Sequence, residues 1–254
     1  MSANKLENGS ANAHATSGLV EIKNPEITRG RRLIFTLNVR GPARDALLSD
    51  ALWVEYDVRI AEIPLSLLTI PCVSSLATLA WATGCKVSVQ QIDEAFARSL
   101  FHVRDAFKRF YPKLPFSGTL RGQRVTNDYA ADAAALLFSA GVDSIASYLR
   151  YRHLRPSLLT FFGGDISLTE EALRSLARRR IARFAAEEKI GFWAVTSNAR
   201  FLLDETYLNR NLRALLGGND WWGGFSHGIV QLGVCAPICA LDGVGRLVIA
   251  STHT

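Results

Sequence analysis

The second half of the chain alternates between short apolar runs and longer segments of mixed character. The apolar runs have strand length and occupy residues 135–138, 157–162, 191–197 and 245–251. Between them, segments such as 142–152 and 168–189 have compositions compatible with helices. Strands that alternate with helices predict parallel β-α units with right-handed crossovers, so we expect an α/β domain over residues 130–254.

The first half of the chain has a different pattern. Two runs rich in β-branched and aromatic residues predict strands at 33–39 and 52–58. Another short strand is expected at 87–89, and apolar residues then recur at helical spacing from Ile92 to Phe110, which indicates a helix with a core-facing stripe. Together these elements predict a smaller α+β domain over residues 30–120.

Three segments do not follow these patterns. Residues 1–28 are polar without a sustained apolar run, which predicts a disordered tail that lacks the core of a secretory signal and indicates a cytoplasmic protein. Residues 112–128 contain prolines and glycines and are expected to be a linker. The uncharged stretch 63–85 has the length of a membrane span, but its prolines and hydroxyl residues favour a buried helix around 74–83, and no membrane association is expected.

Composition narrows the class of protein only slightly. The 254 residues are 48% hydrophobic, enough for one large core or two modest ones, and the net charge of +6 suits an anionic partner without choosing between a nucleotide and nucleic acid. The four cysteines form no C-x-x-C pair and lie in apolar segments, which predicts buried, reduced thiols.

The turn after the first strand of the second half carries the candidate chemistry. It reads Ser139-Ala140-Gly141-Val142-Asp143-Ser144. Small residues let the backbone approach a ligand, and the first N–H groups of the next helix have no helical partner, so such a turn binds anionic oxygens such as those of phosphate. Strand-to-helix turns in α/β sheets favour small residues for structural reasons as well, and the chain has no G-x-x-x-x-G-K-[ST] P-loop.

This turn resembles the S-G-G-x-D-S pyrophosphate loop of the PP-loop ATP pyrophosphatases, which belong to the adenine nucleotide alpha-hydrolase-like group. The resemblance covers roughly residues 130–254 and implies a parallel sheet with flanking helices, preceded here by the smaller α+β domain. Ala140 departs from the pattern, which has glycine at this position. The added methyl group is tolerated at negative φ and unfavourable at positive φ.

The resemblance also implies a set of ligands and binding residues. ATP and Mg²⁺ are the implied cofactors, with Asp143 at the metal. The implied nucleotide-binding residues are Ser139, Ala140, Gly141, Val142, Asp143 and Ser144, with Gly163 and Gly164 near the adenosine and His253 in a polar segment after the last strand. His227-Gly228 resembles the segment before that strand in the deazaguanine-synthase and amino-acid-epimerase branches. Because chains of these families continue past the His-bearing segment, we expect a shortened homologue or a fragment of a longer reading frame.

Ligands of parallel sheets bind at the carboxyl ends of the strands. The expected rim therefore combines 139–144, 163–165, 196–198 and 251–254. The activity that the resemblance implies is ATP-dependent adenylation of a small-molecule carboxylate or carbonyl, such as an amino acid or cell-wall precursor, with release of pyrophosphate. Two alternatives remain open. One is a tRNA-modifying enzyme, permitted by the arginines of 168–189 although no basic-aromatic RNA-binding pattern precedes them. The other is a degenerate nucleotide-binding protein without turnover.

Overall fold

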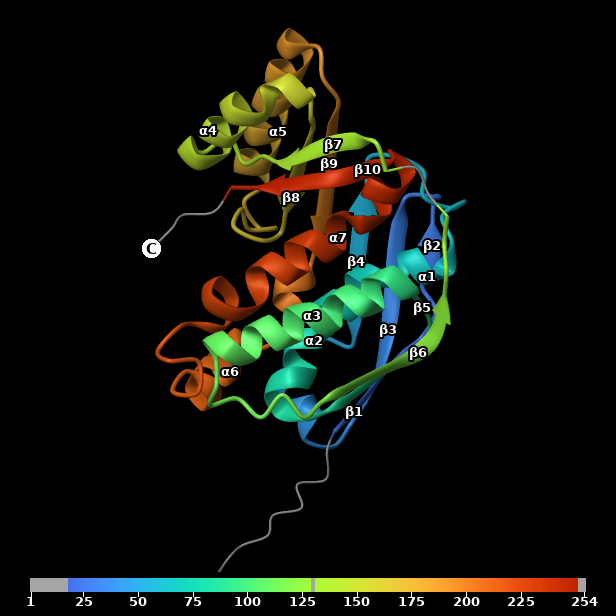
Figure 1. The fold of residues 1–254 in the computed structure, drawn as a ribbon, viewed down its shortest axis with the longest axis vertical. Coiled ribbons are helices and arrows are strands. Elements are labelled where there is room, and N and C mark those ends of the chain that lie inside the picture. Colours follow the sequence, from blue (N-terminus) through green and yellow to red (C-terminus); the bar gives the residue numbers. More distant parts are fainter. Residues whose placement is uncertain (1–17, 129–130, 251–254) are drawn as a thin grey trace, which may run out of the picture.

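The strands of the described residues belong to one sheet with helices packed on it. The computed structural model describes residues 18–128 and 131–250, and its sheet has ten strands in the order β10-β7-β8-β9-β4-β3-β1-β5-β6, with β2 paired to β3 (Figure 1). The strands are β1 Leu19–Ile22, β2 Glu26–Thr28, β3 Arg32–Arg40, β4 Ala51–Tyr56, β5 Lys86–Asp93, β6 Thr119–Val125, β7 Ala133–Leu137, β8 Ser157–Phe162, β9 Phe192–Ser197 and β10 Val244–Ile249. The α-helices are α1 Leu65–Leu68, α2 Ile70–Thr83, α3 Glu94–Phe110, α4 Val142–Tyr151, α5 Glu171–Glu188, α6 Glu205–Leu212 and α7 His227–Leu241.

The second half of the chain forms the parallel part of the sheet. Strands β10, β7, β8 and β9 lie side by side and are all parallel, which confirms the predicted β-α arrangement of this half. Successive side chains of each strand point to opposite faces. Leu136 and Leu158 pack with Ile181 under α4 and α5, whereas Leu137 and Leu159 belong to the larger core that includes α7. Burial on both faces explains why these strands read as continuous apolar runs.

The first half of the chain extends the same sheet. Strands β3 and β4 confirm the two predicted strands, and β4 pairs antiparallel with β9 through Val54 and Ser197. Leu33 and Phe35 are fully buried, whereas the alternate residues Ile34 and Thr36 are more exposed, so one face of these strands packs on the core. Helices α2 and α7 pack against each other over this core. Strands from both expected domains, on either side of the boundary between residues 120 and 130, therefore belong to one continuous sheet.

The prediction of a disordered tail through residue 28 is wrong for its last part. Residues 19–22 and 26–28 form β1 and β2, while residues 1–17 lie outside the described part of the chain. Val20 and Ile22 are buried around exposed Glu21, an alternation that suits a strand but is too short to stand out in the sequence.

The predicted linker at 112–128 is also wrong, because it contains strand β6. This strand lies at the edge of the sheet and pairs in parallel with β5. Close packing requires glycine within this strand and just before it: a Cβ at Gly122 would lie 2.9 Å from Cγ1 of Val89, and one at Gly118, which precedes the strand, would lie 1.9 Å from the carbonyl oxygen of Ala80. These glycines allow close contacts between elements, although in the sequence they resemble the glycines of a loop.

Two of the described helices are strongly apolar. The predicted buried helix in 63–85 is confirmed by α2, whose residues from Ile70 to Ala82 are all buried. A π-helical segment, Trp221–Ser226, continues into α7, and the 21 residues Trp221–Leu241 are long and apolar enough to cross a membrane. In this structure α7 packs on α2 and contacts β8, β9 and β10.

Candidate functional site

The predicted strand-turn-helix is present at the carboxyl end of β7. The strand ends at Leu137, the helix α4 begins at Val142, and Gly141 is its N-cap residue. The Ser144 hydroxyl donates to the Gly141 carbonyl oxygen at 2.8 Å, and the Ser139 hydroxyl lies 3.4 Å from that of Ser144. Within the described residues no side chain caps α4, so N–H groups of its first turn remain available to an anion.

Ala140 adopts the unfavourable backbone conformation. Its φ is +61°, in the left-handed region. The methyl group of an L-residue costs about 1–2 kcal/mol there relative to an ordinary helical conformation. Ala140 therefore has the positive φ at which its methyl group is unfavourable. Glycine, which the S-G-G-x-D-S pattern has at this position, would relieve the strain.

We expect Ala140→Gly to raise the free energy of unfolding by about 1 kcal/mol, because glycine adopts positive φ without a steric penalty. Urea denaturation measures the change. Ala146→Gly, at an exposed position inside α4, is the matched control and should lower the same free energy by about 1 kcal/mol. A loss of stability in both variants would show that the methyl group of Ala140 is not strained.

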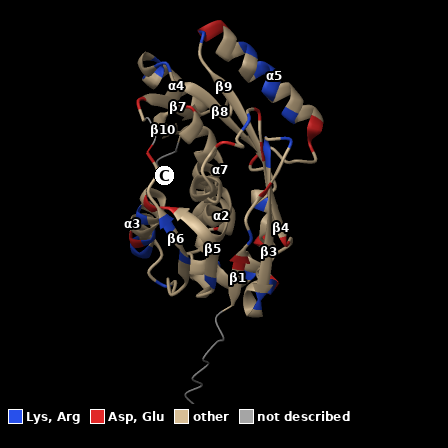
Figure 2. Ribbon diagram, turned by 90° about the vertical axis from the view of Figure 1, so that its right-hand side faces the viewer, with Lys and Arg blue, Asp and Glu red and all other residues tan. Residues whose placement is uncertain are grey.

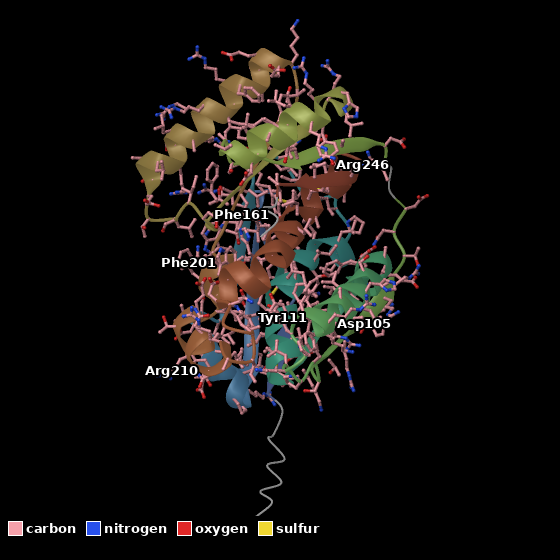
Figure 3. All side chains as sticks on the ribbon, turned by 60° about the vertical axis from the view of Figure 1, so that its left-hand side comes forward. Asp105, Tyr111, Phe161, Phe201, Arg210 and Arg246 are labelled. Carbon is pink, nitrogen blue, oxygen red and sulfur yellow. The ribbon has the colours of Figure 1, made fainter. Side chains whose placement is uncertain are left out.

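A cavity opens beside this turn. Its volume is about 140 Å³, and it lies at the ends of β7 and β10, where Leu137 and Ile249 line it. Polar groups reach it from several elements: the hydroxyl residues Ser139 and Ser144, Asp165 after β8, and His227 and Gln231 of α7. Phe161, labelled in Figure 3, also lines it from β8. The turn after β7, the turn after β8 and the start of α7 therefore meet at one place.

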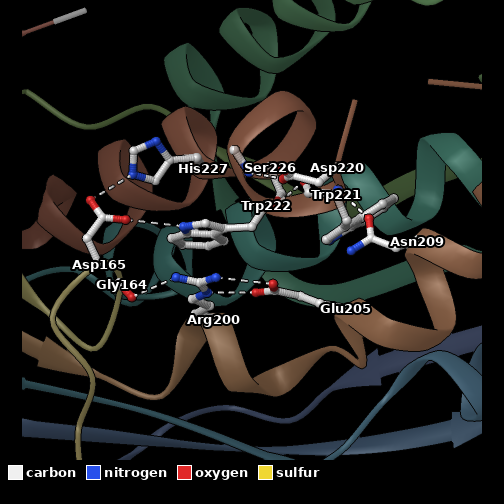
Figure 4. A network of polar contacts seen from close by, with 11 residues as sticks. Gly164, Asp165, Arg200, Glu205, Asn209, Asp220, Trp221, Trp222, Ser226 and His227 are labelled. Carbon is white, nitrogen blue, oxygen red and sulfur yellow. Dashed lines mark hydrogen bonds and ion pairs between the residues drawn. The ribbon is translucent and has the colours of Figure 1, made fainter. Parts of the chain in front are cut away.

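Asp165 and His227 form the polar centre of this cavity. Nε2 of His227 lies 3.4 Å from Oδ2 of Asp165, and the indole N–H of Trp222 donates to Oδ1 at 3.4 Å (Figure 4). The hydrogen bond with His227 is the main cause that lowers the pKa of the Asp165 carboxyl, and Trp222 and nearby Arg200 act in the same direction. Gln231 reaches the same imidazole nitrogen at 2.7 Å from the next turn of α7. Asp165 and Gln231 thus both contact Nε2 of His227, which donates to the carboxylate only when it carries the proton.

Arg200 anchors the turn that carries Asp165. Its guanidinium donates to both carboxylate oxygens of Glu205, at 2.8 and 3.2 Å, and to the carbonyl oxygen of Gly164 at 3.1 Å. The same group lies over the ring of Trp222, 4.9 Å from its centroid. Bidentate pairing fixes the orientation of the guanidinium. As Figure 4 shows, the Trp222 ring lies between Arg200 and His227, with Asp165 beside its indole nitrogen. The network therefore joins the turn after β8 to the π-helical segment before α7.

Gly163 and Gly164 have clear packing roles. Gly163 has a φ of +100°, and a Cβ there would lie 1.9 Å from the carbonyl oxygen of Ser197. A Cβ at Gly164 would lie 2.8 Å from the Phe161 ring. Neither glycine lines the cavity, whereas their neighbour Asp165 does. Close packing therefore requires glycine at both positions, and their expected contact with adenosine stays a prediction.

The other expected rim residues have different positions. Asn198 is engaged with β4: its Oδ1 accepts from the Trp53 N–H at 2.8 Å, and its Nδ2 donates to the Ala51 carbonyl oxygen at 3.0 Å. Val142 and Asp143 are exposed and do not line the cavity. His253, with the rest of 251–254, lies outside the described residues.

Cysteine and acidic clusters do not add a metal site. Cys235 is buried in α7 as expected, Cys239 is partly buried, and burial raises the pKa of the Cys239 thiol to about 12. Over residues 18–128 and 131–250, no group of three or more His, Cys, Asp or Glu side chains is arranged to hold a metal ion.

The sequence predicted residues 163–165 on the rim and gave His227-Gly228 only as part of a resemblance, so the contact between Asp165 and His227 and the residues that support it were not predicted. Gln231 had a readable signal, because it lies four residues after His227 on one helix and therefore on the same face. The contacts of Arg200 and Trp222 with the turn after β8 arise from tertiary packing and had no such signal. Comparison of the chain with protein-family models, with curated proteins and with solved structures gives no match.

Proposed function

We propose that the protein binds ATP with Mg²⁺ at the Ser139–Ser144 turn and adenylates a small-molecule carboxylate or carbonyl, with release of pyrophosphate. The position of the cavity is the observation that carries this proposal. The parallel strands follow one another along the chain as β7, β8, β9 and β10. Across the sheet, however, their order is β9-β8-β7-β10. The order reverses between β7 and β10, and α/β sheets bind ligands in the crevice at such a switch point.

The turn offers the groups that a pyrophosphate needs. The N–H groups at the start of α4 and the hydroxyl groups of Ser139 and Ser144 are donors for phosphate oxygens. Asp143 is exposed beside them. Since nucleotide-bound Mg²⁺ usually takes one or two carboxylates together with phosphates and water, a single accessible carboxylate fits this ion. The ion would neutralise charge on the phosphates.

The remaining polar residues of the cavity suit a second substrate. Asp165 and His227 line the same cavity as Ser139 and Ser144, and Arg200 donates to the Gly164 carbonyl oxygen in the turn that carries Asp165. In the proposed reaction a substrate oxygen attacks the α-phosphorus of ATP, the bond between the α-phosphorus and its bridging oxygen breaks, and pyrophosphate leaves. The contribution of the protein is to position the two reactants.

We expect Asp143→Asn to weaken MgATP binding by about tenfold, the effect of losing about 1.4 kcal/mol of interaction with the metal. Calorimetry with Mg²⁺ and ATP measures the affinity. Asp132→Asn is the matched control, because Asp132 is exposed just before β7, at the opposite end of the strand from the turn, and its affinity should equal that of the parent. Equal affinity in Asp143→Asn and the parent would place Asp143 outside the metal sphere.

A nucleotide-binding protein without turnover is the second candidate. The positive φ of Ala140 and the small cavity favour it, because 140 Å³ is below the roughly 300–1,000 Å³ of most small-molecule sites. A pyrophosphate-release assay with amino acids and nucleosides decides between the two. Steady release supports the adenylating enzyme, whereas MgATP binding without release supports the second candidate.

The tRNA-modifying alternative depends on the arginines of α5, which Figure 2 shows along this helix. Two of them have carboxylate partners: Arg178 pairs with Asp57 at 2.8 Å and Arg183 with Glu187 at 2.9 Å. Copurification of RNA with the protein, reversed by salt, would favour this alternative.

A further inference from the structure

A second cavity lies between α3 and the edge strand β6. Its volume is about 250 Å³, larger than the cavity at the switch point, and the two share no lining residue. Apolar side chains line it from three elements, with Trp81 from α2, Leu100 from α3 and Leu120 from β6. Trp81 is 5% exposed and Leu100 is 6% exposed. These three side chains therefore form an apolar wall of the cavity, which is held by the main core.

The cavity results from the way α3 and β6 pack. Leu100 is buried, but Phe110, which belongs to the expected core-facing stripe, is 75% exposed, so that stripe is covered only in part. On the β6 side, Gly118 and Gly122 line the cavity without contributing a side chain. Both are confined to glycine by their contacts with Ala80 and Val89. The cavity is therefore left open because contacts elsewhere require glycine, which has no side chain, at these two lining positions.

Three arginines also line the cavity: Arg98 and Arg104 of α3 and Arg124 of β6. The carboxylate of Glu94 accepts from Arg98 at 3.4 Å and from the hydroxyl group of Thr126 at 2.8 Å. Glu94 therefore lies near Arg98 and Arg124, and among the described residues that line the cavity there is no Asp or Glu.

Arg104 has no carboxylate partner among the described residues, in contrast to Arg98, which pairs with Glu94. Its guanidinium lies 4.7 Å from the centroid of the Phe101 ring, and its Nε is buried without a hydrogen-bond partner among the described residues. The acid next to it in sequence, Asp105 (labelled in Figure 3), pairs with Lys108 at 3.1 Å. Arg104 is therefore available to an external anion.

We propose that this α3–β6 cavity binds a small amphipathic carboxylate, with a flat apolar body against Trp81, Leu100 and Leu120 and its carboxylate at Arg104 and Arg124. Planar guanidinium groups bind carboxylates in bidentate fashion, and the aromatic and aliphatic lining excludes water from the ligand body. The site is separate from the proposed nucleotide site and does not depend on its activity.

Indole-3-acetate is the probe, and indole-3-ethanol is its uncharged counterpart. Binding to the full chain is measured by calorimetry and by the chemical shift of the Trp81 indole N–H. We expect indole-3-acetate to bind about tenfold more tightly than the alcohol, the usual scale for a charge-assisted hydrogen bond. Arg104→Gln should remove this preference and leave the weak binding of the alcohol. The control variant is Arg109→Gln, because Arg109 is exposed on the same helix and does not line the cavity. This variant should bind both compounds as the parent protein does.

Ala97→Leu tests the cavity itself, because Ala97 lines it from α3 and the larger side chain fills it. This variant should lose both compounds while its circular dichroism spectrum and melting temperature remain those of a folded protein. Equal binding of acid and alcohol, unchanged binding in a folded Ala97→Leu variant, or no saturable binding of indole-3-acetate would each overturn the proposal. MgATP titrations of the same variants report separately on the nucleotide site.

Discussion

Gly163→Ala is expected to lower the free energy of unfolding by about 3 kcal/mol or more, because two unfavourable terms act at the same residue. The φ of +100° disfavours any L-residue by about 1–2 kcal/mol, and overpacking typically costs about 1–3 kcal/mol. The new Cβ would lie 1.9 Å from the Ser197 carbonyl oxygen, a backbone atom of β9 that cannot rotate away. Urea denaturation measures the loss.

The control for this prediction separates backbone strain from contact. Gly217 also has a positive φ, +67°, but a Cβ there would meet no described atom within 4 Å. Gly217→Ala should therefore cost only about 1 kcal/mol, from the backbone alone. Equal losses in the two variants would contradict a tight contact between the turn after β8 and β9.

Gly233→Ala should lower the free energy of unfolding by about 2 kcal/mol, within the range for overpacked cores. Gly233 lies where α7 crosses α2, and a Cβ there would lie 1.7 Å from Oγ and 2.3 Å from Cβ of Ser74. The Ser74 hydroxyl donates to the Pro71 carbonyl oxygen at 2.9 Å, so moving it also breaks a buried hydrogen bond. The two helices would have to separate to make room.

Gly228→Ala is the matched control on the same helix. A Cβ at Gly228 meets no described atom within 4 Å. Since alanine is favoured over glycine in a helix by about 1 kcal/mol, this variant should be slightly more stable than the parent. Thermal denaturation of both variants checks the opposite signs; two changes of the same sign would argue against close packing of α7 on α2.

Strands were predicted correctly where their own residues form a recognisable pattern, and were missed where they depend on pairing with distant parts of the chain. The strand predicted at 157–162 matches β8 because five of its six residues are buried and form one apolar run. Strand β1 has four residues, and β6 contains Gly122 between two arginines, so neither carries a recognisable strand pattern. Both are defined by pairing with β5, a contact between distant parts of the chain. Such pairings are not visible in local periodicity.

The same distinction applies to the candidate site. The Ser139–Ser144 turn was predictable because strand, small residues and helix follow one another in sequence. The sign of φ at Ala140 was not, since local sequence permits both conformations. The contact of Arg200 with Gly164 was not predictable either, because it depends on how β8 and β9 are placed side by side.

The pairing of β4 with β9 has a consequence for synthesis of the chain on the ribosome. Val54 emerges long before its partner Ser197, and α7, which covers the core of the first half together with α2, emerges later still. Until then the nascent first half has an unpaired strand edge at β4 and an uncovered apolar face, the two features that most favour association between incomplete chains. We therefore expect the first half to complete its folding only after translation has passed α7, and we expect chaperone contact to be most needed during translation of the second half.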